Sequence, residues 1–140
     1  MTDSRTIDVT PLPSSGMVTL THVIYALHAF ALFTGVATSA TIIGSFVSGL
    51  PSIVAVIINY VKRDAVRGTW LDSHFRWQIR TFWFALLWIV VSTLLAITII
   101  GLPFAFVLMG LAGLWVLYRI ARGWINLSNR QAMPVPEPVA

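Results

Sequence analysis

The chain has 140 residues, of which 57% are apolar and 10% are charged, and its mean hydropathy is +0.84. Soluble domains average about 25% charged residues, so this composition excludes an ordinary water-soluble domain and indicates an integral membrane protein. The net charge of +4 is explained by anchoring to anionic lipid headgroups, and nucleic acid is not an expected partner. The absence of cysteine excludes disulfides, thiolate catalysis and Cys-ligated metals.

Two long stretches contain no charged residue: 9–61, which is 53 residues long, and 81–118, which is 38 residues long. One spanning helix needs about 20 apolar residues, so each stretch has room for two. The sequence therefore predicts an all-α fold. We expect an integral membrane helical bundle with four transmembrane helices and both termini cytoplasmic, a multi-pass protein of the inner (cytoplasmic) membrane.

The first predicted helix follows a short polar segment. Residues 1–17 contain Pro11, Pro13 and Gly16 and are predicted to form a disordered cytoplasmic tail. A transmembrane domain is expected at residues 18–127, with its first helix at about 18–45.

The second span admits two interpretations, because Gly49, Leu50 and Pro51 interrupt the apolar run. Proline suits the first turn of a helix, which favours a short helix from Pro51 to about Arg63. That helix would have about 13 residues, or roughly 20 Å, against a hydrocarbon core of about 30 Å. The alternative is a span that begins near Ile42 and is kinked at Pro51.

A basic cytoplasmic loop at residues 62–80 separates the first two spans from the last two. The third span is predicted at residues 81–100. The uncharged turn at residues 101–103 makes the third and fourth spans antiparallel neighbours. The fourth covers about residues 104–124, where Gly110 and Gly113 are expected to allow close helix approach. Residues 128–140 are predicted to be a Pro-rich disordered tail.

The distribution of positive charge sets the expected orientation. With four spans, the amino-terminal tail has one Lys or Arg, the central loop five, the carboxy-terminal segment three and the other loops none. All nine then fall on one side, which the positive-inside rule places in the cytoplasm. An arrangement with three spans would place only Arg5 outside, so charge hardly distinguishes three spans from four. The 53-residue length of the first uncharged stretch favours four. The predicted membrane-boundary anchors are Lys62, Arg63, Trp115, Tyr118, Arg119, Arg122 and Trp124.

Two segments, NYVKRDAVRGTWLDSHFRWQIRTFWF at residues 59–84 and WVLYRIARGW at residues 115–124, resemble a family of small bacterial membrane proteins with an uncharacterised domain. That family is distantly similar to the chloroplast inner-envelope import component Tic-twenty. The resemblance covers about residues 20–127, and its most specific motif is SHFRWQIRTFWF at residues 73–84. It implies a four-helix membrane bundle but no activity, and a role in a protein-conducting channel would be fold analogy only.

No catalytic, cofactor-binding or metal site is predicted. The sequence lacks paired carboxylates, a phosphate loop and zinc-ligand spacing, so we expect neither an enzyme nor a cofactor. His22 and His28 are six residues apart and cannot share a metal ion from one helix face. His28 is expected to be a neutral histidine hydrogen-bonded inside the bundle, with a proton relay or a haem ligand as the alternative.

One interaction surface is predicted at the start of the third span. Arg76 and Arg80 are one helical turn apart, and the guanidinium group suits phosphate or carboxylate. We expect a candidate interaction surface made of His74, Arg76, Trp77 and Arg80. The competing interpretation is a plain membrane anchor, because basic residues beside tryptophan are typical of any cytoplasmic membrane boundary.

Three functions are compatible with these features. The leading one is a structural, assembly or interaction component, which would bind anionic lipid headgroups, a second copy of the chain or a partner membrane protein. The second is a subunit of a transport or protein-conducting channel, which requires polar residues through the bundle. The third is a haem or quinone-binding membrane protein.

Overall fold

The computed structural model describes residues 10–39 and 41–135. The described chain forms the helices α1 (Ser15–Ala37), α2 (Ile42–Val61), α3 (Arg63–Val66), α4 (Leu71–Ala96) and α5 (Leu102–Ser128), and no strand occurs in these residues. The predicted all-α fold is thus confirmed. By length and composition, α1, α4 and α5 are long and apolar enough to cross a membrane, which indicates a membrane protein.

Local side-chain hydrogen bonds fix where the first two helices begin. The Ser14 hydroxyl accepts a hydrogen bond from the backbone N–H of Met17 at 3.3 Å, and the Thr41 hydroxyl accepts one from Gly44 at 3.2 Å. Because Thr41 caps α2, the helix begins at Ile42 and contains Pro51 in its interior. This start agrees with the second of the two interpretations, in which the helix begins near Ile42 rather than at Pro51.

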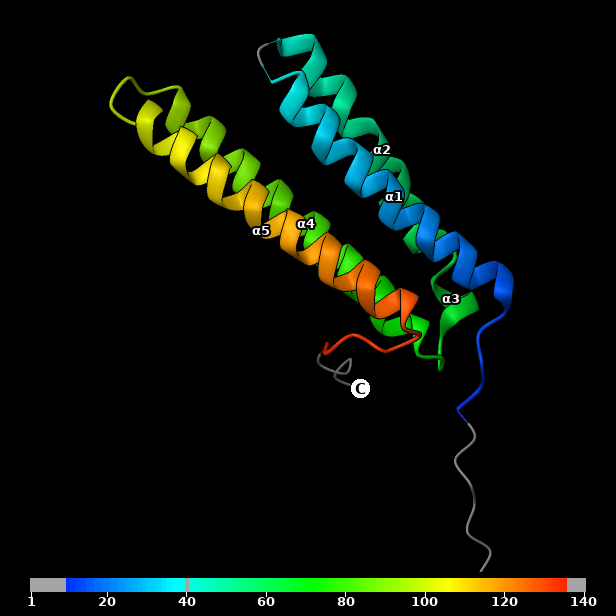
Figure 1. Cartoon of the computed structure of the whole chain (residues 1–140). Coiled ribbons are helices and arrows are strands. Elements are labelled where there is room, and N and C mark those ends of the chain that lie inside the picture. The colour runs from blue at the N-terminus through cyan, green and yellow to red at the C-terminus, as the bar shows by residue number, and fades with distance from the viewer. Residues whose placement is uncertain (1–9, 40, 136–140) are drawn as a thin grey trace, which may run out of the picture.

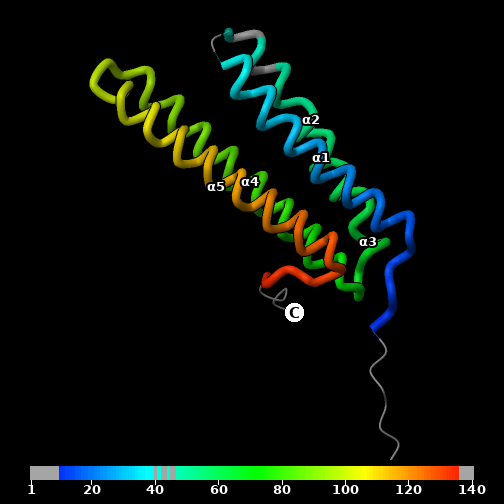
Figure 2. The backbone as a smooth tube through the Cα atoms, in the orientation of Figure 1, coloured from blue at the N-terminus to red at the C-terminus, as the bar shows by residue number. Residues whose placement is uncertain are grey.

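The four long helices form two antiparallel pairs. Helix α1 packs along α2, and α4 packs along α5 (Figure 1). A tight turn at residues 97–101 connects α4 to α5. The short helix α3 connects the pairs at one end, which we call the α3 end. Figure 2 shows the two pairs close together at the α3 end and diverging toward the opposite end. The described segments before α1 and after α5 also lie at the α3 end.

The burial of side chains also decreases from the α3 end toward the opposite end. In α1 the buried residues are Thr21, Ile24 and Tyr25, in the half of the helix near the α3 end, and His28, just past its midpoint. In α4, seven of the eight buried residues fall between Leu71 and Thr81. The opposite end instead exposes large apolar side chains, among them Val36, Ile99 and Phe106. The packed core therefore sits at the α3 end, and the diverging halves present an apolar surface suited to lipid.

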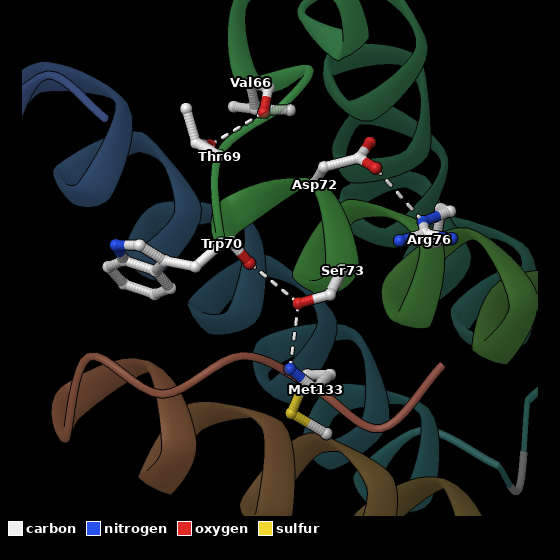
Figure 3. A network of polar contacts seen from close by, with 7 residues as sticks. All are labelled: Val66, Thr69, Trp70, Asp72, Ser73, Arg76 and Met133. Atoms are coloured by element: carbon white, nitrogen blue, oxygen red, sulfur yellow. Dashed lines mark hydrogen bonds and ion pairs between the residues drawn. The ribbon is translucent and has the colours of Figure 1, made fainter. Parts of the chain in front are cut away.

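The segment after α5 folds back onto the start of α4. Met133 is 4% exposed, and its backbone N–H donates to the Ser73 hydroxyl at 2.8 Å, which itself donates to the Trp70 carbonyl at 2.7 Å (Figure 3). Residues 129–135 thus contact the core, although they fall in the segment predicted from composition to be disordered. The Met133 side chain and the Ser73 hydroxyl are two of the contacts that hold this segment. Residues 136–140 lie outside the described part of the chain.

Gly123 is where α5 accommodates a side chain of α1. A methyl group added at Gly123 would overlap the ring of Tyr25. Gly110 and Gly113, the glycines expected to allow close approach, have no atom within 4 Å of such a methyl group. That expectation was wrong because helix spacing does not reveal which face of α5 meets another helix.

We expect Gly123→Ala to destabilise the protein by about 1 to 3 kcal/mol, because the Tyr25 ring must move to admit the new methyl group. Thermal unfolding in mild detergent measures the effect. Gly113→Ala is the matched control: it lies on the same helix with open space around it, and should be neutral or stabilising by up to about 1 kcal/mol. Equal melting temperatures for the two variants would contradict this packing.

Candidate functional site

A cluster of aromatic and polar side chains joins the two helix pairs at the α3 end; we call Tyr25, His74, Trp124 and the Gln131 carbonyl the junction cluster. His74 Nε2 lies 2.7 Å from the Gln131 carbonyl oxygen, and His74 Nδ1 lies 2.9 Å from the Tyr25 hydroxyl. A carbonyl only accepts, so Nε2 donates to it, and a neutral imidazole then accepts the Tyr25 proton at Nδ1. His74 is 0% exposed and both ring nitrogens are used, so it links α1, α4 and the final segment.

Aromatic contacts complete the junction. The Tyr25 ring stacks on Trp124 with centroids 6.4 Å apart, and the Trp124 indole N–H donates to His22 Nδ1 at 3.0 Å. Trp70 meets His74 edge-on at 5.6 Å between centroids. Aromatic pairs of this kind contribute about 0.5 to 1.5 kcal/mol beyond their buried area. The junction therefore ties α1 to both α4 and α5.

A second set of contacts locks α4 to α5. The Trp77 indole N–H donates to the Arg119 carbonyl at 3.0 Å, while Arg119 Nε donates to the Thr81 hydroxyl at 2.6 Å. The Arg119 guanidinium carbon lies 3.5 Å from the centroid of the Trp77 ring, a cation–π contact. Arg119, predicted as a boundary anchor, therefore also joins two helices through a hydroxyl and a ring.

The face of α4 that carries Arg76 and Arg80 borders a hollow of about 220 Å³. We call this the arginine hollow. Its walls come from α2, α3, α4 and the segment after α5, and they are Tyr60, Arg63, Arg76, Ile79, Arg80 and Val135. Three arginines and one tyrosine are thus among the described residues that line one opening.

The structure separates the four residues of the predicted interaction surface. Arg76 and Arg80 line the same hollow, as their spacing of one turn implies. His74 and Trp77 are buried and belong to the junction cluster and the α4–α5 contact, respectively. The sequence does not distinguish the inward face of α4 from its outward face, because both carry aromatic and polar residues.

Charge around the arginine hollow is unevenly balanced. Asp64 and Asp72 are the acidic residues of the described chain. Asp64 pairs with Arg67 at 3.0 Å, and Asp72 pairs with Arg76 Nε at 3.2 Å, the second pair being drawn in Figure 3. Within the described residues, neither Arg63 nor Arg80 has a carboxylate partner. Counted over the described residues, the hollow therefore carries an excess of positive charge, the electrostatic property of an anion site.

Two buried amides form a third polar feature. Asn59 is 0% exposed and Gln78 is 2% exposed, and in the described structure neither the oxygen nor the nitrogen of either side-chain amide has a hydrogen-bond partner. His28 Nδ1 pairs with the Ser52 hydroxyl at 2.6 Å, while its Nε2 has no partner. Unsatisfied buried polar groups cost about 1 to 3 kcal/mol each, so these positions are candidates for function. No group of three or more metal-ligand side chains occurs in the part of the chain that the structure describes.

Several of these residues escaped prediction. Arg63 was predicted only as a membrane-boundary anchor and Tyr60 was not singled out, because no sequence pattern shows that α2 and α3 lie against α4. Tyr25 and Gly123 are nearly 100 positions apart and carry no motif. Gln78 sits inside the Ser73–Phe84 motif between Arg76 and Arg80, and nothing in the sequence indicates that it is buried. Comparison with protein-family models, curated proteins and solved structures gave no significant match.

We expect Asn59→Leu and Gln78→Met to leave the melting temperature unchanged or to raise it, because each removes an unpaired buried amide at similar volume. The comparison is Tyr25→Phe, which strips the partner from a satisfied buried bond and should cost about 1 to 3 kcal/mol. Thermal unfolding in the same detergent compares all three. A larger loss for either amide variant than for Tyr25→Phe would mean that the amide binds something in the native protein.

Proposed function

We propose that this chain is a small multi-pass protein of the bacterial cytoplasmic membrane with a structural, assembly or interaction role that it performs at its cytoplasmic end. One observation carries the proposal: the fixed core, the arginine hollow and the described positive charges gather at the α3 end, while the opposite end offers apolar side chains. A protein of this design has its specific chemistry at one membrane face. The resemblance of the Ser73–Phe84 motif to small bacterial membrane proteins supports the same assignment.

Four spans and cytoplasmic termini fit this proposal. Helix α2 has 20 residues, or about 30 Å at 1.5 Å per residue, which matches the hydrocarbon thickness of a bilayer. The alternation of the four long helices brings Lys62, Arg63 and the positive charges of α4 and α5 to the α3 end. The positive-inside rule then assigns that end to the cytoplasm. The expected partners are anionic headgroups, a second copy of the chain or another membrane protein.

Site-specific photo-cross-linking in the natural membrane tests the interaction role. We expect a photoreactive residue at exposed positions of the α3 end, Arg67 or Gln131, to form adducts of one defined mass. The matched positions at the opposite end are the exposed residues Ile99 and Phe106, which should react with lipid alone. If Arg67 and Gln131 form no adduct of defined mass while Ile99 and Phe106 react with lipid, an interaction role is rejected.

The second candidate is a transport or channel subunit, which the buried Asn59 and Gln78 amides favour because polar groups inside a membrane bundle often mark substrate or ion paths. Solute or ion flux through liposomes that contain the purified chain separates the two functions. Flux above that of empty vesicles, lost in the double variant Asn59→Leu/Gln78→Met, would favour transport. A structural or interaction component gives no such flux.

Reporter fusions test the topology. We expect cytoplasmic signals at residues 15, 68 and 132 and periplasmic signals at residues 48 and 102, because all nine Lys and Arg then share one side. A periplasmic signal at residue 15 together with a cytoplasmic signal at residue 68 would replace four spans by three.

A further inference from the structure

We propose that the arginine hollow is a binding site for the phosphate group of an anionic phospholipid, whose acyl chains run along the outer faces of α2 and α4. This inference rests on the proposed function in one respect, the placement of the α3 end at a membrane face. It goes further in assigning a ligand class and the residues that contact it.

The hollow supplies the donors that a phosphate needs. Arg63 and Arg80 reach it from α3 and α4, and each guanidinium offers a planar pair of N–H groups that matches two phosphate oxygens. Their charges meet no carboxylate among the described residues. An anion in the hollow would therefore bring the compensating charge that the described chain does not provide.

Tyr60 adds a neutral donor at the rim. Its hydroxyl accepts a hydrogen bond from the Trp83 indole N–H at 2.9 Å, which fixes the position of the oxygen. The hydroxyl proton is then directed elsewhere and can be donated to a phosphate oxygen. Trp83 is itself exposed, and an indole in this position is typical of the headgroup level of a membrane.

The surroundings of the hollow favour a lipid over a soluble phosphate. On α2, the exposed residues Ile57 and Ile53 follow Tyr60 at intervals of three and four positions, so they continue its face away from the α3 end. On α4, exposed Trp83 and Leu87 continue the face of Arg80 at the same intervals and in the same direction. Two apolar stripes therefore start at the arginine hollow and run toward the membrane centre.

The size of the hollow agrees with a headgroup contact. At about 220 Å³ it is smaller than the roughly 300 to 1,000 Å³ typical of pockets that enclose a whole small molecule. It therefore suits one phosphate group with its substituents outside. In a phospholipid those substituents are the glycerol and acyl chains, for which the stripes of α2 and α4 provide the surface.

Lipid titration of the purified full-length chain tests the site. The chain is titrated in neutral detergent with short-chain phosphatidylglycerol or phosphatidylcholine, and native mass spectrometry reports the bound lipid and its dissociation constant. We expect phosphatidylglycerol to bind at least about tenfold more tightly, and Arg63→Gln/Arg80→Gln to abolish that preference. The matched control Lys62→Gln/Arg130→Gln removes two positive charges that do not line the hollow and should change the constant by less than about twofold.

Further variants separate this site from plain charge attraction and from a free phosphate site. Arg63→Lys/Arg80→Lys keeps the charge but loses the planar fork, so we expect intermediate affinity. Equal weakening by the two double Gln variants would mean general attraction and would overturn the proposal. So would full displacement of the lipid by millimolar inorganic phosphate together with equally tight binding of glycerol phosphate. If the unaltered chain shows no preference for phosphatidylglycerol while the cross-links from Arg67 or Gln131 still form, this inference is rejected and the proposed function stands.

Discussion

The packing of this protein depends on polar contacts at one end, because apolar surfaces alone give little drive for helix association in lipid. Lipid chains are as apolar as leucine, so hydrogen bonds and close side-chain fit must hold membrane helices together. Here the Tyr25–His74 bond joins the helix pairs, and Gly123 gives the Tyr25 ring its place. The burial gradient follows from this arrangement: the pairs are fixed where these contacts lie and diverge where only apolar side chains remain.

Helix α4 connects the junction cluster to the arginine hollow. Its inward face carries His74 and Trp77, which bind α1, α5 and the final segment, while Arg76 and Arg80 on a neighbouring face line the hollow. Val135 also lines the hollow, and it lies in the segment after α5 (residues 129–135) together with Gln131 and Met133. The position of the arginine hollow is therefore set by the same contacts that hold the helix pairs together, so a change in these contacts would also change the hollow.

Composition and the spacing of charges were sufficient to predict an all-α fold, because a long uncharged stretch in lipid must satisfy its own backbone hydrogen bonds and a helix does so within one segment. They also indicated that Arg76 and Arg80 share a face, since a single helix fixes that relation. Contacts between helices were beyond reach: nothing in the sequence places Arg63 beside Arg80, or Tyr25 against Gly123. The segment after α5 was predicted to be disordered, as part of residues 128–140, because that range contains three prolines. The sequence does not show that the Met133 backbone N–H donates to the Ser73 hydroxyl.

The order of synthesis decides when the segment after α5 (residues 129–135) can pack against the start of α4. A chain emerging from the ribosome completes α1 and α2 first and α4 and α5 later, and each antiparallel pair has its own internal contacts. The Gln131 carbonyl and the Met133 amide, which pair with His74 and Ser73, are synthesised only after α5. The His74 ring therefore gains its second hydrogen-bond partner only after α5 has been made, so the junction can close only after both antiparallel pairs have been synthesised.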